Sequence, residues 1–251
     1  SLLVDGHVSR TFLSRRAEQY FLDLLKTKSI PLIKNLSYPG REGHFFLVGP
    51  FDTPSLLDRG VVDKGTVVPQ RMWAPHTITD KKQHVEEAVL QMPIFFESLD
   101  GQLGLSLDAA AAGRCHGLRN AQEFAPLGHK STTHIRILWP GYKDFKRQVQ
   151  IRDETSEHNP ITTSRFAHHI GRSVDAFLKV RPSDLLSTIP VLTRFLSRQA
   201  CEADPGSTDD RRELWVIGPY GIQRSDIIVI GAIHVSAGSW MPILQLNRYV
   251  L

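Results

Sequence analysis

The length and composition of the chain indicate an ordinary folded protein. It has 251 residues, of which 41% are hydrophobic and 22% are charged, so it can bury a core, and disorder of the whole chain is excluded. With 30 Lys and Arg residues against 26 Asp and Glu, the net charge of +4 permits an acidic or phosphate-rich partner without requiring one. The longest apolar run, residues 227–233, is far shorter than the ~20 residues of a bilayer span, which predicts a soluble protein without a membrane partner.

The first half of the chain is predicted to alternate short strands with two amphipathic helices. An Asp100-Gly101 pair separates two apolar runs, which favours a β-hairpin with a two-residue turn because both central positions tolerate positive φ. The expected elements are a helix over 13–25, strands over 30–36 and 44–48, an irregular connection over 50–78, a helix over 79–91 that ends at Pro93, and hairpin strands over 94–99 and 102–107.

Residues 134–179 hold most of the concentrated chemistry of the chain. The segment 134–139 alternates apolar and polar residues and stops at Pro140-Gly141, which predicts a strand followed by a turn. Period-two spacing then predicts a second, half-exposed strand over 145–151. After Pro160, apolar residues recur at helical spacing and predict an amphipathic helix; they are Phe166, Ile170, Val174, Phe177 and Leu178.

The last part of the chain is predicted to add helices and two strands. Apolar spacing indicates two short helices or one kinked helix after Pro182, and the polar segment 202–212 is expected to be a mobile loop. Strands are expected over 214–217 and 227–235. Together these elements predict a single compact α+β domain over residues 1–251, with antiparallel hairpins packed against amphipathic helices.

Complete catalytic, metal and nucleotide signatures are missing from the sequence, so we expect no catalytic residue, no metal and no cofactor. Phosphate-binding glycine motifs do not occur, Ser236 lacks the context of a nucleophile elbow, and Cys115 and Cys201 fit neither a zinc site nor a disulfide scaffold. A metal-dependent hydrolase remains a further alternative, because carboxylates and imidazoles are concentrated at Asp153, Glu154, His158, His168 and His169.

Basic and aromatic residues near the predicted hairpin and helix form a candidate binding surface. Such residues on neighbouring elements suit an acidic peptide or a nucleic-acid backbone. Interspersed acidic residues, including Asp144 and Asp175, favour the alternative of an ordinary solvated face. The candidate binding residues are Trp139, Tyr142, Lys146, Arg147, Arg165, His168 and Arg172.

The same region carries a resemblance. The segments WPGY at 139–142, RD at 152–153, PIT at 160–162 and HVSAGSW at 234–240, with the helix from Phe166 to Phe177, resemble uncharacterised predicted proteins of mushroom-forming (basidiomycete) fungi. The resemblance implies an intracellular protein, nuclear or cytoplasmic, and assigns no activity.

The sequence therefore predicts a non-enzymatic binding or regulatory protein. Its expected partner is a protein or an acidic peptide, and a nucleic-acid-binding protein is the alternative.

Overall fold

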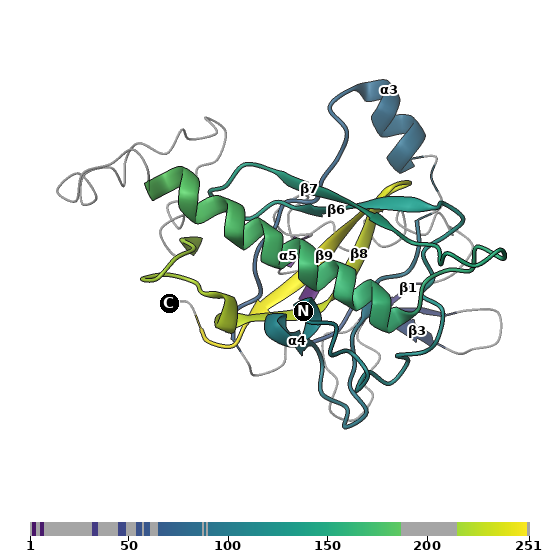
Figure 1. Ribbon diagram of the computed structural model, residues 1–251. Helices are drawn as coiled ribbons and strands as arrows, with labels where there is room; N and C mark the ends of the chain where they lie inside the picture. The colour runs from purple at the N-terminus through teal and green to yellow at the C-terminus, as the bar shows by residue number, and fades with distance from the viewer. Residues whose placement is uncertain are drawn as a thin grey trace.

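A mixed β-sheet of six strands forms the centre of the molecule (Figure 1). The computed structural model describes residues 2–3, 6–7, 32–34, 45–48, 54–56, 58–60, 65–86, 88, 90–186 and 215–249. The strands of the sheet run in the order β4-β8-β9-β6-β7, and β5 also pairs with β8. These strands are β4 (Ile94–Phe95), β5 (Leu105–Ser106), β6 (Thr132–Ile137), β7 (Phe145–Gln150), β8 (Ile227–Ser236) and β9 (Ser239–Leu246).

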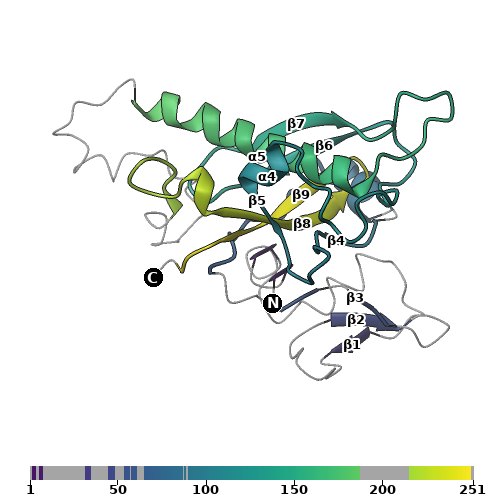
Figure 2. The ribbon, with the colours of Figure 1, turned by 60° about the horizontal axis from the view of Figure 1, so that its bottom comes forward.

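The remaining elements are a small second sheet and a few helices. Strands β1 (Leu32–Lys34), β2 (Phe45–Val48) and β3 (Pro54–Leu56) pair antiparallel, as Figure 2 shows. The helices of the described residues are α3 (Ile78–Lys81), the π-helix η3 (Lys82–Glu86), α4 (Leu107–Ala111), α5 (Thr163–Leu186) and the 3-10 helix η7 (Arg224–Asp226).

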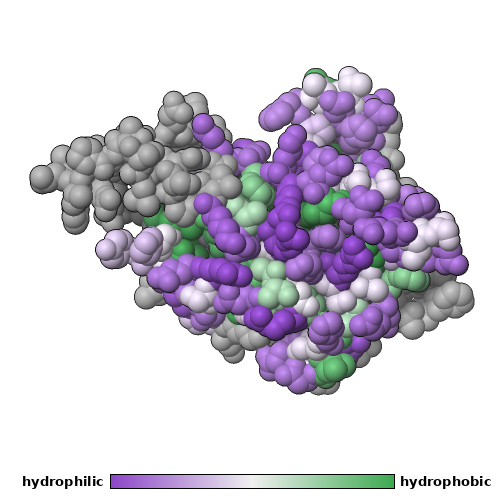
Figure 3. Space-filling view, viewed as in Figure 1, coloured by the Kyte–Doolittle hydropathy of each residue, from purple (hydrophilic) through white to green (hydrophobic). Residues whose placement is uncertain are grey.

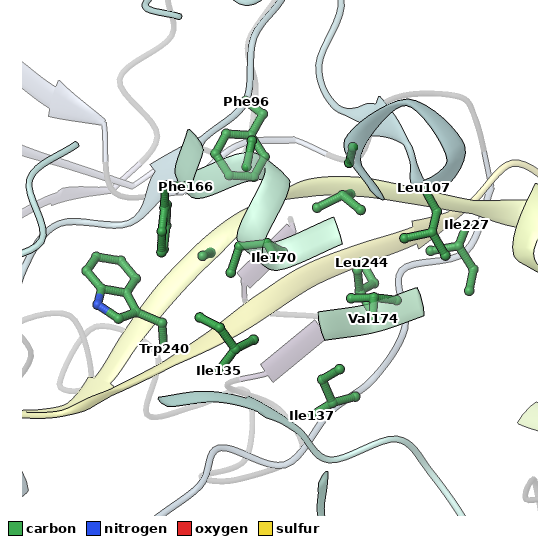
Figure 4. Packing of buried hydrophobic residues seen from close by; sticks show 14 of the residues in the cluster. Phe96, Leu107, Ile135, Ile137, Phe166, Ile170, Val174, Ile227, Trp240 and Leu244 are labelled. Carbon is green, nitrogen blue, oxygen red and sulfur yellow. The ribbon is translucent and has the colours of Figure 1, made fainter. Parts of the chain in front are cut away.

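The long helix α5 lies across one face of the central sheet (Figures 1 and 2). Its apolar stripe packs on the sheet, where Phe166 lies beside Trp240 (Figure 4), with 5.5 Å between the ring centroids. Further along the helix, Phe177 packs against Trp139 with 5.9 Å between the ring centroids. Gly171 allows α4 to pack against α5, since a Cβ there would lie 2.5 Å from the Ala110 carbonyl carbon. A second apolar cluster covers the opposite face of the sheet and includes Leu2, Leu3, Val67, Ile233 and Met241.

The fold is α+β, as predicted, but its central strand β9 was not expected. Every residue of β9 is buried. Pro242 argues against a central strand because it cannot donate a ladder hydrogen bond. It pairs with Ala232 of β8 on one side and lies where β9 changes its neighbour on the other side. Residues Ser239 and Trp240 pair with β6, and Gln245 pairs with Val67. The missing N–H of Pro242 therefore lies between the residues that pair with β6 and the residue that pairs with Val67.

Several local expectations differ from the structure. The sheet is mixed, since β6 and β9 pair in parallel, whereas only antiparallel hairpins were expected. The runs on either side of Asp100-Gly101 meet in an antiparallel bridge between Glu97 and Leu103, but the turn is wider than two residues, because the Ser98 amide donates to the Gln102 carbonyl at 2.8 Å. The helix expected over 79–91 is shorter: α3 begins at Ile78 behind a Thr77 cap, and η3 ends at Glu86.

Other expectations lie outside the described residues. These are the helix over 13–25, the part of the predicted helical region that follows Leu186, the mobile loop over 202–212 and Cys201. Helix α5 itself continues through Pro182, where the sequence predicted a new helix to begin. Among the helices that the structure describes, none combines the length and apolarity that crossing a bilayer requires.

Candidate binding surface

The exposed side of α5 presents a row of basic residues. Arg165, Arg172 and Lys179 are spaced by seven residues, which is close to two helical turns, so they recur on one side of the helix. All three are exposed, whereas Phe166, Ile170 and Val174 on the opposite side are buried. Hydrophilic residues accordingly gather over α5 on the face of the molecule shown in Figure 3.

Strand β7 contributes a further arginine to this side. Residues Phe145, Arg147 and Val149 share one face of the strand, and the buried Val149 identifies it as the face toward α5. The Arg147 guanidinium donates a hydrogen bond to the Arg172 carbonyl at 3.0 Å. This bond ties the edge of the sheet to the middle of the helix and holds the Arg147 charge beside α5.

The positive charges of these residues help to lower the pKa of the His169 imidazole. It is half-buried, and its pKa is lowered from 6.5 to about 4, first by burial and then by the charges of Arg165, His168, Arg147 and Arg172. Because four basic groups on two elements act on one ring, the helix and the strand form one positive region there. His169 is therefore neutral at pH 7.

Carboxylates lie on another flank of α5. Asp175 binds Lys179 at 2.7 Å and Arg224 at 3.1 Å, and Arg224 also binds Asp108 of α4 at 3.1 Å. Asp153 accepts a hydrogen bond from the Thr155 hydroxyl at 2.6 Å. Within the described part of the chain, Arg147, Arg165 and Arg172 have no carboxylate partner. We call these three residues the arginine surface.

His168 of α5 and Lys146 of β7 are predicted binding residues that do not belong to the arginine surface. The Nδ1 atom of His168 is 3.0 Å from the Ala110 carbonyl, so this ring faces α4. Lys146 has the opposite parity from Arg147 and pairs with Arg136 of β6, which places it on the other face of the sheet. The expectation of one continuous basic surface that includes Lys146 is therefore wrong.

Both predicted aromatic residues serve the core. Trp139 is only 1% exposed, and its indole N–H donates to the Trp215 carbonyl at 2.8 Å. The Tyr142 hydroxyl accepts a hydrogen bond from the Ile217 amide at 2.9 Å, and its ring packs edge-on against Phe177 at 6.0 Å. Trp139 is thus not a surface residue, and Tyr142 joins the segment after Trp215 to the helix.

The histidines and carboxylates of the hydrolase alternative do not form a metal site. Among the residues that the structure describes, no group of three or more His, Cys, Asp or Glu side chains could hold a metal ion. Cys115 is a buried free thiol, and burial raises its pKa, which keeps it protonated. Cys115, Asp153, Glu154 and His158 therefore do not extend the candidate site.

A depression of about 570 Å³ lies beyond the end of β7, lined in part by His129, Arg152 and His158. The Arg152 guanidinium donates to the carbonyls of Gly128 and Lys130, so its charge serves to hold this loop in place. This depression does not include the arginine surface.

Comparisons of the chain with protein-family models, with curated proteins and with solved structures found no match. The candidate function of the chain therefore rests on the arrangement of its own residues. The arginine surface was partly foreseen from sequence, since Arg147, Arg165 and Arg172 were all candidate residues. His169 was missed as a member of this region; its position on the helix flank beside the predicted strand was the available signal.

Proposed function

We propose that this protein is a non-catalytic binding protein that captures an acidic segment of a partner protein on the arginine surface. The observation that supports this proposal is the convergence of Arg147, Arg165 and Arg172 around His169 without a carboxylate partner among the described residues. Guanidinium groups suit this role because they bind carboxylates through two parallel hydrogen bonds and never lose their charge near neutral pH.

An acidic protein segment suits this surface better than a single-stranded nucleic acid. Single strands are bound by basic grooves together with aromatic side chains on which bases stack. Trp139 and Tyr142, the two aromatic residues of the predicted binding surface, are engaged in the core and with Ile217. The arginine surface has positive charge but no free aromatic ring from Trp139 or Tyr142 for base stacking. This combination favours a ligand that is recognised through its carboxylates.

The proposal is tested by measuring the affinity of a capped octaglutamate peptide with fluorescence anisotropy over a salt series. Charge reversal in the double variant Arg165→Glu/Arg172→Glu is expected to weaken binding by at least about tenfold, because attraction becomes repulsion. Lys81→Glu/Lys82→Glu is the matched control. It also changes the net charge by four units, on two exposed residues outside the arginine surface, and is expected to leave the affinity within about twofold.

The same assay with duplex DNA addresses the alternative partner. Duplex binding with a steep salt dependence, together with no peptide binding, would assign the surface to nucleic acid. Failure of both probes at low salt, or equal losses in Arg165→Glu/Arg172→Glu and in Lys81→Glu/Lys82→Glu, would overturn the proposed function.

A further inference from the structure

Strand β7 ends the central sheet, and its outer side has backbone groups available for pairing. It pairs with β6 on one side, and no strand of the described chain pairs with residues 145–150 on the other. The Ile151 amide donates to the Ser131 carbonyl at 2.9 Å, and this bond fixes the alternation along the ladder. Backbone groups of Arg147 and Val149 consequently point toward β6, and those of Lys146, Gln148 and Gln150 point outward.

The chain pairs with another of its own segments just beyond the end of β7. Arg152 forms an antiparallel bridge with Pro160, with bonds from the Ile161 amide to the Ile151 carbonyl at 3.2 Å and from the Asp153 amide to the Asn159 carbonyl at 2.9 Å. These bonds use the carbonyl of Ile151 and the amide of Asp153, so the regular alternation of β7 ends at Ile151. Residues 159–161 therefore border the end of the edge without continuing it, and the outward groups of residues 146–150 stay available.

Cations flank this edge on both faces of the sheet. Lys146 is exposed on one face, and Arg147 lies on the other, where it contacts Arg172 on α5. Like charges next to an edge strand oppose pairing with a second copy of the same strand. An incoming strand that carries carboxylates would instead meet opposite charge on each face.

We propose that an acidic, extended segment of a partner protein binds as an added strand on the outer edge of β7. This inference rests on the proposed function and specifies how the ligand is held. The outward N–H and C=O groups of Lys146 and Gln148 form main-chain hydrogen bonds with the segment, which supply affinity for any extended sequence. Side chains at alternate positions of the segment point toward α5, where carboxylates meet Arg147 and Arg172, so the recognised pattern has an acidic residue at every second position.

Two N-methylated peptides test the added strand directly. The parent is a capped peptide that alternates Glu with Thr, and each derivative carries N-methyl groups on one of its two sets of alternating residues. Only one set of amides can face β7, so one derivative is expected to bind at least about tenfold more weakly and the other to retain the parent's affinity. Equal affinities of the two derivatives would overturn the added strand.

A proline at position 148 removes an outward N–H from the protein itself. The variant Gln148→Pro leaves the bonds to β6 in place, and proline is tolerated on an edge strand when its missing N–H faces solvent. Its affinity for the Glu-Thr peptide is expected to fall about fivefold or more relative to Gln148→Ala, which removes the same side chain but keeps the N–H. Equal affinities of these two folded variants would contradict the inference.

The outcomes separate this inference from the proposed function. If the double charge reversal abolishes binding while both N-methylated derivatives bind alike, the acidic partner stands and the added strand is wrong. If neither octaglutamate nor the Glu-Thr peptide binds, both proposals are wrong. If Gln148→Pro does not fold, the N-methylated pair still decides the question.

Discussion

Acidification should destabilise the protein through the buried His234 imidazole. His234 is 5% exposed and stacks on Trp240 at 4.6 Å between ring centroids, and its Nδ1 accepts a hydrogen bond from the Gln91 amide at 2.8 Å. A proton on Nδ1 would remove this acceptor. Burial is the main cause that lowers the pKa of His234 from 6.5 to about 4, with the nearby Lys130 charge adding to it and a hydrogen bond to Ser236 opposing it.

The size and sign of this effect follow from linkage. The unfolded histidine binds a proton below pH 6.5 and the folded one only below about pH 4, so the contribution to stability is fully present above pH 6.5 and is lost as the pH falls toward 4. Between pH 8 and pH 5 the loss from this single residue amounts to about 2 kcal/mol in the free energy of unfolding, at 1.36 kcal/mol per pKa unit.

Urea denaturation of the wild type and of His234→Asn at pH 8 and pH 5 measures this contribution. The asparagine side-chain oxygen can accept the bond from Gln91, and the lost stacking on Trp240 lowers stability at both pH values. Titration of every other group is common to the two proteins. The pH-dependent loss should therefore be about 2 kcal/mol smaller in the variant. Equal losses in the two proteins would show that His234 titrates normally and refute the reasoning.

Three further predictions follow from the core and the arginine surface. Phe177→Ala should lower the free energy of unfolding by about 3–5 kcal/mol in urea denaturation, because its buried ring packs against Trp139, Tyr142 and Phe145; a loss below about 1 kcal/mol would contradict this packing. The pKa of His169, followed by NMR, should rise from about 4 when octaglutamate binds, since added negative charge favours the imidazolium; an unchanged pKa in a saturated complex would place the peptide elsewhere. Trp139→Phe should cost about 1–3 kcal/mol of stability by leaving the Trp215 carbonyl unpaired, and it should not change peptide affinity; a loss of affinity at unchanged stability would return Trp139 to the binding site.

Strand parity shows how far sequence patterns could locate the site. Trp139 has the same parity as Ile135 and Ile137, which are both fully buried, so the alternation itself indicated a core position. Its aromatic character beside a turn suggested a surface role, and that interpretation was wrong. Lys146 and Arg147 are consecutive residues of one strand, so their side chains lie on opposite faces of the sheet.

The central sheet shows what local patterns could not supply. Strand β9 contains Pro242, which locally argues against a strand, and only its change of neighbours from β6 to Val67 removes the conflict. Likewise the apolar runs around Asp100-Gly101 pair with β8, more than 120 residues later in the chain. Such pairings depend on competition among distant partners for the same edges, which a short window of sequence does not contain.

By itself, the sequence determined the α+β class and the faces of α5. The helical spacing of Phe166, Ile170 and Val174 required that stripe to be buried, and the same period placed Arg165 and Arg172 on the solvent side. Only the tertiary structure decided that Arg147 reaches the Arg172 carbonyl, that the His169 imidazole is partly buried, and that β7 lies at the edge of the sheet. These features depend on how α5 crosses the strands and on the order of strands in the sheet. Both are fixed by long-range packing, because one apolar stripe fits many arrangements and the complementary shapes of the core select among them.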